Sequence, residues 1–300
     1  MIDTNKKHAY LLMAHNNIEQ LNLLLTTLDS EYCDIYLHID LKSNIAEDDI
    51  VALTKSEIYF SKEISVFWAD YSQVECELFL LEQAVRKNYK YYHLLSGADF
   101  PLKTPKEIAD YLYEDNKIYL HFATPENVAF TYKYVKYHHF FQKQLYIVNR
   151  GKQFSIFKVI NKLCLIVQKV LRVNRVQDNI QIKKGANWFS IPDDVAKFVL
   201  TKKSWIRKQF INTRSGDEFF LQTVLYNSNF KNRIYHFNED DNYESCLRYI
   251  DWKRGNPYIF QKQDYMELIS CKMFFARKFD IRMDRDIIIM LKNELLTHSK

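Results

Sequence analysis

The chain has 300 residues, 47% of them hydrophobic and 15% aromatic. This is enough apolar material for one large folded domain or two small ones, and it excludes a disordered chain. The formal net charge is only +5, because 42 basic residues nearly balance 37 acidic ones, so the charge indicates an anionic ligand or surface and not nucleic acid specifically.

The cysteines and the start of the chain do not indicate a secreted protein or one stabilised by a structural metal. The five cysteines are widely spaced and form no CxxC or Cys/His cluster, so we expect reduced structural thiols. The start, MIDTNKKHAY, lacks the apolar stretch of a secretory signal, and no run of about 18 apolar residues occurs, so we expect a cytoplasmic protein. With five glycines and no GxGxxG or GxxxxGK[ST], a glycine-rich phosphate loop is excluded.

The first 125 residues alternate between apolar runs typical of strands and amphipathic segments typical of helices. The expected strands are His8–Ala14, Asp34–Ile39 (followed by Asp40), Ile58–Ser61, Ile64–Trp68 and Tyr91–Leu95, and the expected helices are Ile18–Leu28 and Gln73–Arg86. Such an alternation predicts βαβ units and a parallel sheet.

The segment YYHLLSGADFPLKT, residues 91–104, is the most informative in the chain. A buried strand breaks at Ser96-Gly97, and Asp99 follows it at the sheet edge where α/β proteins bind ligands. The alternative is a loop aspartate that caps a helix beginning near Thr104. The segment alone does not decide between these interpretations.

Residues 133–184 are aromatic and basic, and we interpret them as an insertion over one face of the sheet. Within it, apolar residues of Ile156–Arg172 fall at helical spacing among Lys158, Lys162, Lys169 and Arg172. A basic amphipathic helix can lie on an anionic membrane. The alternative is a helix packed on its own domain with solvated lysines.

The last third returns to short strands and helices without a flexible linker, which predicts one compact catalytic unit. We expect strands at Ala186–Ile191 and Leu247–Ile250, and helices at Pro192–Leu200, Asp217–Leu225 and after Lys262 and Asp284.

Three groups of charged residues in this part are candidates for chemistry. In SGDEFF, Asp217 and Glu218 open a helix, where acids are stabilised by free amide groups, yet one of them can enter a pocket; Glu218 is the better candidate base. Lys278, with Arg254 or Arg277, can bind a diphosphate, the alternative being a surface pair with Asp280.

A metal site has weaker support. The one DxD triplet, Asp284-Arg285-Asp286, opens an expected helix near the end of the chain, which is a capping context and lacks a preceding apolar strand. We therefore expect no metal and no cofactor.

Several segments, taken in order, resemble the core-2/I-branching β-1,6-N-acetylglucosaminyltransferases, a family that includes peptide O-xylosyltransferases. The segments are 8–17 (HAYLLMAHNN), 36–43 (YLHIDLKS), 66–74 (VFWADYSQV), 91–104, 185–190 (GANWFS), 215–220, 247–253 (LRYIDWK) and 275–280 (FARKFD). The resemblance covers nearly the whole chain.

The resemblance implies an α/β fold of the GT-A-like (Rossmann-type) class: a mixed sheet flanked by helices in a single domain, 1–300. Residues 1–125 would form the half that binds the nucleotide sugar, and residues 185–300 the acceptor and catalytic half. It also implies an inverting glycosyltransferase with a UDP-sugar donor, in which basic side chains neutralise the diphosphate in place of a metal.

The resemblance further assigns roles to individual residues. Glu218 falls on the general base, Asp40 on the uridine-binding acid, and Trp68 on an aromatic against the uracil. The remaining positions are Ala14 and His15 at the nucleotide edge, Lys278 and Arg254 at the diphosphate, and Trp252, Trp188 and Asp99 on the acceptor side.

Animal members have a membrane anchor and many disulfides. We expect neither feature in this chain, which therefore resembles a bacterial cytoplasmic relative. We expect it to transfer a sugar, GlcNAc before xylose, to a saccharide acceptor of a surface polysaccharide, lipid-linked in one reading. The enzyme would then lie peripherally on the inner face of the cytoplasmic membrane, held by the basic helix. A non-catalytic carbohydrate-binding protein and a metal-dependent transferase that uses Asp284 and Asp286 are the alternatives; a nucleic-acid partner is not expected.

Overall fold

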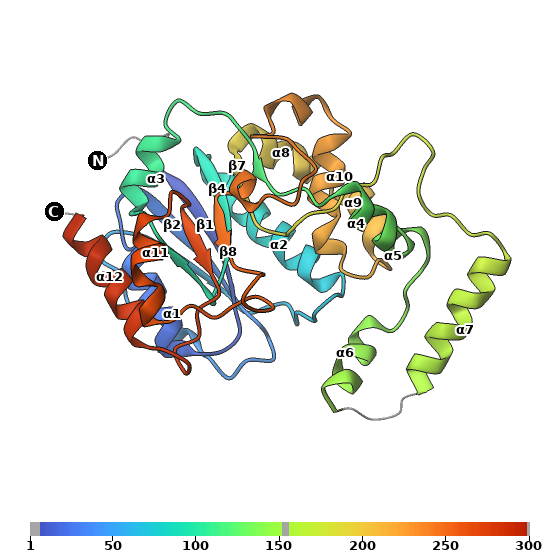
Figure 1. The fold of residues 1–300 in the computed structure, drawn as a ribbon, viewed down its shortest axis with the longest axis horizontal. Coiled ribbons are helices and arrows are strands. Elements are labelled where there is room, and N and C mark those ends of the chain that lie inside the picture. Colours follow the sequence, from blue (N-terminus) through green and yellow to red (C-terminus); the bar gives the residue numbers. More distant parts are fainter. Residues whose placement is uncertain (1–6, 152–155, 299–300) are drawn as a thin grey trace.

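The computed structural model describes residues 7–151 and 156–298, and in it a central sheet lies between layers of helices (Figure 1). The strands in these ranges are β1 (His8–Ala14), β2 (Cys33–Ile39), β3 (Ile58–Ser61), β4 (Tyr91–Ser96), β5 (Asp99–Pro101), β6 (Tyr119–Leu120), β7 (Phe189–Pro192), β8 (Arg248–Ile250) and β9 (Phe275–Arg277). The α-helices are α1 (Ile18–Leu28), α2 (Ser72–Ala84), α3 (Pro105–Tyr111), α4 (Pro125–Thr131), α5 (Lys133–Lys136), α6 (Gln142–Gly151), α7 (Ile156–Val170), α8 (Asp193–Thr201), α9 (Lys203–Phe210), α10 (Phe220–Tyr226), α11 (Tyr265–Ser270) and α12 (Asp286–His298).

The main sheet is mixed, as the sequence predicts. Its strand order in the described residues is β3-β2-β1-β4-β7-β6, with β1 to β4 parallel and β7 antiparallel to both of its neighbours. A smaller sheet, β5-β9-β8, lies beside it. Strand order reverses direction at β1, because the chain goes from β1 to β2 and β3 on one side and then returns to β4 on the other.

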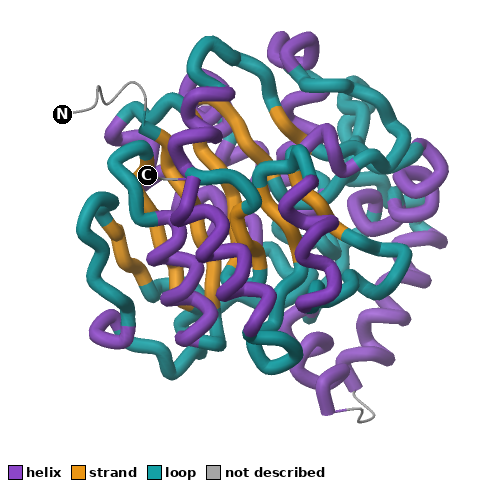
Figure 2. Tube along the Cα trace, turned by 60° about the vertical axis from the view of Figure 1, so that its left-hand side comes forward, coloured by secondary structure: helices purple, strands orange, loops and turns teal. Residues whose placement is uncertain are grey.

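Two apolar cores cover the two faces of the sheet, since successive strand residues point to opposite sides. Ala9 and Leu11 of β1 face the core formed with α2, α8 and α10, whereas Tyr10 and Leu12 face the core formed with α1, α11 and α12. The continuous apolar runs of β1, β2 and β4 are therefore explained by burial on both faces. Figure 2 shows helices covering one face of the strands.

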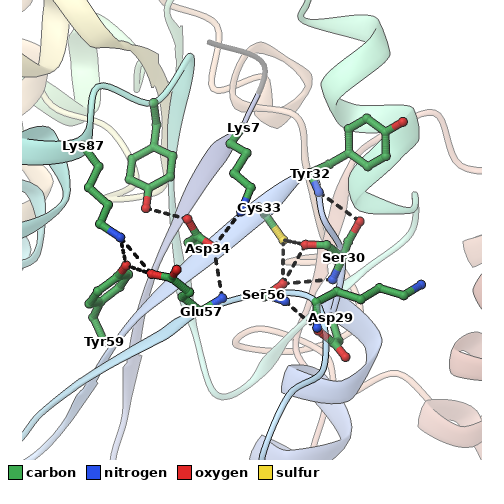
Figure 3. Close-up of polar contacts among 12 residues, drawn as sticks. Lys7, Asp29, Ser30, Tyr32, Cys33, Asp34, Ser56, Glu57, Tyr59 and Lys87 are labelled. Atoms are coloured by element: carbon green, nitrogen blue, oxygen red, sulfur yellow. Dashed lines mark hydrogen bonds and ion pairs between the residues drawn. The ribbon is translucent and has the colours of Figure 1, made fainter. Parts of the chain in front are cut away.

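At the amino ends of the parallel strands, a polar network ties neighbouring segments together (Figure 3). Buried Asp34 of β2 accepts hydrogen bonds from Lys7 Nζ (3.2 Å), the Glu57 amide (3.0 Å) and the Tyr89 hydroxyl (2.8 Å). These partners precede β1, β3 and β4, so one carboxylate holds the starts of all four strands in register. This network lies at the edge of the sheet opposite to the carboxyl ends of the parallel strands, where α/β proteins bind ligands.

The expected strand Ile64–Trp68 is wrong, because the backbone of this segment bonds to side chains and a loop. The Ile64 amide donates to His38 Nε2 (3.1 Å), and the Ile64 carbonyl accepts from the Leu41 amide (3.1 Å). The Phe67 amide donates to the hydroxyl of Ser72 (2.9 Å). The β-branched and aromatic composition thus belongs to a loop around the end of β2.

Two other expectations have clear outcomes. The helix start at Thr104 is confirmed as a capping box, in which the Thr104 hydroxyl accepts from the Glu107 amide.

The insertion packs on the α2 face of the sheet only through its ends, for example Val135 and Val176, whereas α6 and α7 stand clear of the sheet (Figure 1). No helix within the described ranges is long and apolar enough to cross a membrane.

Candidate active site

A cavity of about 960 Å³ opens at the carboxyl ends of the parallel strands. Met13 and Ala14 of β1, Asp40 after β2, and Leu95 and Ser96 of β4 form its base. This is the point where the strand order reverses, and open α/β sheets bind ligands in the crevice at such a point.

Most of the residues singled out in the sequence meet at this cavity. Those that line it are Ala14, His15, Asp40, Trp68, Trp188, Glu218, Trp252, Arg277 and Lys278. Asp99 and Arg254 are not among the lining residues. Segments separated by more than 250 residues thus converge on one site, as the sequence interpretation requires.

At the end of β2, Asp40 and Lys42 form an ion pair that lines the cavity. Lys42 Nζ lies 2.6 Å from Asp40 and donates to the Val66 carbonyl (2.7 Å). His38, behind them, is kept neutral at pH 7 because burial lowers its pKa to about 4. Trp68 is 59% exposed and lies at the cavity wall, so one ring face is available to a planar ligand.

Glu218 reaches the cavity because the expected helix Asp217–Leu225 is broken in two. A 3₁₀ turn covers Gly216–Glu218, and α10 begins only at Phe220. The turn starts from Ser215 in a left-handed conformation (φ 54°), and both of its acids line the cavity, Asp217 buried and Glu218 with its side chain 38% exposed. Lys184 Nζ lies 3.1 Å from Glu218 Oε2.

Behind Glu218 lies a buried pair of acids. The Asp217 carboxyl accepts a hydrogen bond from Gln73 Nε2 (3.1 Å), and its Oδ1 has no hydrogen-bond partner among the described residues. Burial, followed by the charge of Glu218, raises the Asp217 pKa to about 8. Burial, followed by the charge of Asp217, raises the pKa of Glu77 well above its usual value. Burial thus favours the protonated form of both inner acids, whereas Glu218 has the Lys184 ammonium as a charged neighbour.

The raised pKa of buried Asp217 should make the free energy of unfolding depend on pH. The folded-state pKa of Asp217 lies above its unfolded value, so its contribution to folding is lost as pH rises from about 4 to about 8. We expect Asp217→Asn to gain stability relative to the parent across this range, by at most about 1.4 kcal/mol per pH unit. Urea unfolding at several pH values measures the difference; the exposed Asp48→Asn is the control, and the same trend in both variants would contradict the assignment.

Gly185 brings the Glu218 segment against the end of β6. A Cβ atom at Gly185 would lie 1.8 Å from the His121 carbonyl oxygen, so only glycine fits. The Gly185 amide donates to the Glu218 carbonyl (2.9 Å), and the Ala186 amide donates to His121 Nδ1 (2.9 Å). On its other side, His121 Nε2 lies 3.2 Å from Asp241.

The cations near the cavity differ in how their charge is used. Arg254 forms ion pairs with Asp251, Asp264 (2.7 Å) and Glu267 (3.0 Å). Among the described residues, no carboxylate lies within 4 Å of the Lys278 ammonium, which lines the cavity. Lys278 therefore presents an unneutralised charge to a ligand, and Arg254 does not.

Asp99 acts on the site through another residue. It accepts from the Ser96 amide (2.6 Å) and from Arg277 Nη1 (2.8 Å), and it is buried. Arg277 also donates to the Ser96 hydroxyl (2.6 Å) and lies over the Trp188 ring (4.7 Å). Asp99 thus fixes Arg277 at the end of β4. Both interpretations of residues 91–104 need correction: Asp99 does not line the cavity, and the helix that begins at Pro105 is capped by Thr104 and not by Asp99.

The DxD triplet lies elsewhere in the structure. Asp284 accepts from the Lys262 and Ile287 amides, and Asp286 lies 3.7 Å from Lys262 Nζ, which is the capping arrangement at the start of α12. Neither acid lines the cavity. In the part of the chain that the structure describes, no group of three or more His, Cys, Asp or Glu is placed to hold a metal ion.

Several cavity residues escaped the sequence interpretation, among them Lys42, His121, Lys184, Asp241 and Tyr243. Lys42 had a usable signal, since it lies two residues after Asp40 at a strand end. Asp241 and Tyr243 lie in a polar loop with no local pattern, and only the fold brings them beside His121, whose ring stacks on Tyr243 at 4.0 Å.

Comparison with known proteins gives a consistent result. The family model of the Core-2/I-branching enzymes matches residues 8–271. Xylosyltransferase 2 of Canis lupus familiaris is 22% identical over 307 residues, covering 94% of this chain and 33% of its own length. This chain thus spans about a third of the length of that relative.

Two further matches have related names. The Bos taurus β-1,3-galactosyl-O-glycosyl-glycoprotein β-1,6-N-acetylglucosaminyltransferase is 23% identical over 325 residues, covering 96% of this chain and 69% of its own. The crystal structure of mouse xyloside xylosyltransferase 1 in its apo form covers 90% of this chain and 97% of that one, with 12% identity and a TM-score of 0.36.

Proposed function

The chain belongs to the Core-2/I-branching enzyme family, and we propose that it transfers a sugar from a UDP-sugar to a hydroxyl group of a saccharide acceptor. The transfer inverts the anomeric carbon and uses no metal ion. The observation that carries the proposal is that one cavity brings together the carboxylate of Glu218 and the unneutralised ammonium of Lys278.

The two charged groups support the two halves of a displacement. The acceptor hydroxyl attacks C1 of the donor sugar and gives its proton to Glu218, while the bond from C1 to the diphosphate oxygen breaks and its electron pair leaves with UDP. Lys278 compensates the negative charge that grows on the diphosphate. Because nucleophile and leaving group occupy opposite faces of C1, a single displacement inverts its configuration.

Aromatic side chains support the binding of the remaining parts. Trp68 and Asp40, at the end of β2, are proposed to contact the uridine of the donor. Trp252, 49% exposed with its ring 6.3 Å from that of Tyr243, and Trp188 are proposed to stack on sugar rings of the acceptor. Asp99 has a positioning role in this scheme, through Arg277.

The donor sugar is proposed to be GlcNAc, with xylose as the second candidate because the matched relatives include xylosyltransferases. The acceptor is proposed to be a saccharide of a bacterial surface polymer, assembled in the cytoplasm on a lipid carrier. A protein that only binds carbohydrate would use the same aromatic side chains but would not need Glu218 beside a cation-lined donor site.

The test is UDP release from a panel of donors in the presence of EDTA. UDP-GlcNAc, UDP-xylose, UDP-glucose, UDP-galactose and UDP-GalNAc are each incubated with the purified protein, with and without simple saccharide acceptors. We expect release above the protein-free control for one donor, UDP-GlcNAc or UDP-xylose, and no loss in EDTA. Release only after Mn²⁺ is added would contradict the metal-free scheme, and release from none of the donors with saccharide binding retained would support the binding protein.

A further inference from the structure

Helix α7 carries an apolar surface that nothing in the described residues covers. Its exposed apolar side chains, 36% to 76% accessible, are Ile156, Val159, Ile160, Leu163, Ile166, Val167, Val170 and Leu171 just after the helix. The helix stands clear of the sheet in Figure 1. A contiguous apolar surface of this kind marks an interaction site.

The helix has three distinct sides. At about 100° per residue, the exposed apolar side chains span a sector of about 140°. The basic residues Lys158, Lys162 and Lys169 form a neighbouring sector along one flank, and Arg172 follows in the turn after the helix. The third side faces the protein.

The side that faces the protein is anchored by specific contacts. Gln168, the buried residue of α7, accepts from the His138 amide (2.7 Å) and donates to the His138 carbonyl (3.0 Å). The Phe157 ring lies 5.4 Å from that of Phe141. The alternative, a helix packed on its own domain with solvated lysines, holds only in part: α7 contacts the rest of the chain through Gln168 and Phe157, whereas its apolar stripe is exposed.

We propose that this apolar stripe and its basic flank dock α7 in the plane of an anionic lipid surface. Residues 156–172 include no acidic side chain, so every charge beside the stripe has the sign that anionic headgroups attract. The lysines near such a surface add electrostatic attraction to the burial of the apolar side chains. A second copy docking through the same face would bring the two basic flanks together, which disfavours a dimer.

The docked helix would hold the cavity close to the surface. α7 packs against α6, and Tyr146 of α6 lines the cavity, with its ring 6.2 Å from that of Phe67. Binding of α7 to a membrane thus places the cavity beside substrates carried by lipids. Lipid binding itself does not depend on turnover, so it can be tested whether or not the protein is a transferase.

The experiment is flotation of the full chain with vesicles of phosphatidylcholine, pure or mixed with phosphatidylglycerol. We expect binding to the mixed vesicles, at least tenfold weaker binding to pure phosphatidylcholine, and weakening by salt. Leu163→Gln with Val167→Gln, both at exposed positions, is expected to reduce binding at least tenfold. Lys162→Gln with Lys169→Gln should reduce binding to the anionic vesicles only.

The matched control changes two exposed apolar residues outside α7, Met266→Gln with Met283→Gln, and is expected to bind like the parent. Circular dichroism of each variant tests whether it folds like the parent. Equal binding by the control and the Leu163/Val167 variant, or no binding to anionic vesicles, would overturn the proposal. So would a dimer in size-exclusion chromatography that the Leu163/Val167 variant dissociates.

Discussion

Replacing Glu218 with glutamine is expected to lower the rate of sugar transfer by about 10³-fold, within the range that a general base contributes. Glutamine keeps the size and polarity of the side chain and removes only its ability to take the proton of the acceptor hydroxyl. Affinity for UDP should stay within about threefold of the parent, since the assigned donor contacts lie at Asp40, Trp68 and Lys278. Single-turnover transfer and calorimetric titration with UDP measure the two quantities separately.

The chain offers a close control for this variant. Glu82 pairs with Lys203 at 2.6 Å and its side chain is 43% exposed, much as Glu218 pairs with Lys184 at 3.1 Å and is 38% exposed. Glu82→Gln therefore removes a comparable ion pair outside the cavity and should leave transfer unchanged. A Glu218→Gln rate within tenfold of the parent would show that another group accepts the proton.

Much of the fold could be predicted because the strands β1, β2 and β4 consist largely of apolar residues. Such runs occur where both faces of a strand are buried, and the residue ranges follow directly. The Ile64–Trp68 segment has the same kind of composition but lacks a neighbouring strand, and its amides bond to His38 and Ser72. These residues are only partly buried and Trp68 is exposed, so an apolar composition does not by itself indicate a strand, and pairing is decided by segments far away in the chain.

In the site, too, the sequence can locate residues but cannot show how they interact. Glu218, Asp40 and Lys278 lie in local motifs, so a linear pattern can locate them. The state of a charged group depends on its neighbours in space: Arg254 could be aligned with a diphosphate-binding residue, but only the fold shows that three carboxylates already occupy its guanidinium. The pKa of Asp217 likewise depends on burial against α2, which no local pattern reveals.

The difference between the two cations leads to the second large effect. Lys278→Gln is expected to lower donor affinity and transfer rate together, by about 10²-fold in kcat/KM, because it removes the charge that faces the leaving diphosphate. Arg254→Gln should change kcat/KM by less than about threefold, since its charge is committed to Asp251, Asp264 and Glu267. Initial rates at varied donor concentration in EDTA compare the two.

Two further readouts separate catalysis from folding in this comparison. Lys278→Arg keeps the positive charge and should recover most of the lost rate, whereas a merely structural defect would not be rescued. Arg254→Gln leaves buried Asp264 without its ion-pair partner and with the Gln261 amide still bonded to its carboxylate, so the expected cost appears in the free energy of unfolding, about 1–3 kcal/mol, and not in the rate. The reverse pattern, with transfer lost in Arg254→Gln and retained in Lys278→Gln, would mean that the ion pairs of Arg254 open when the donor binds and that Arg254 carries the diphosphate.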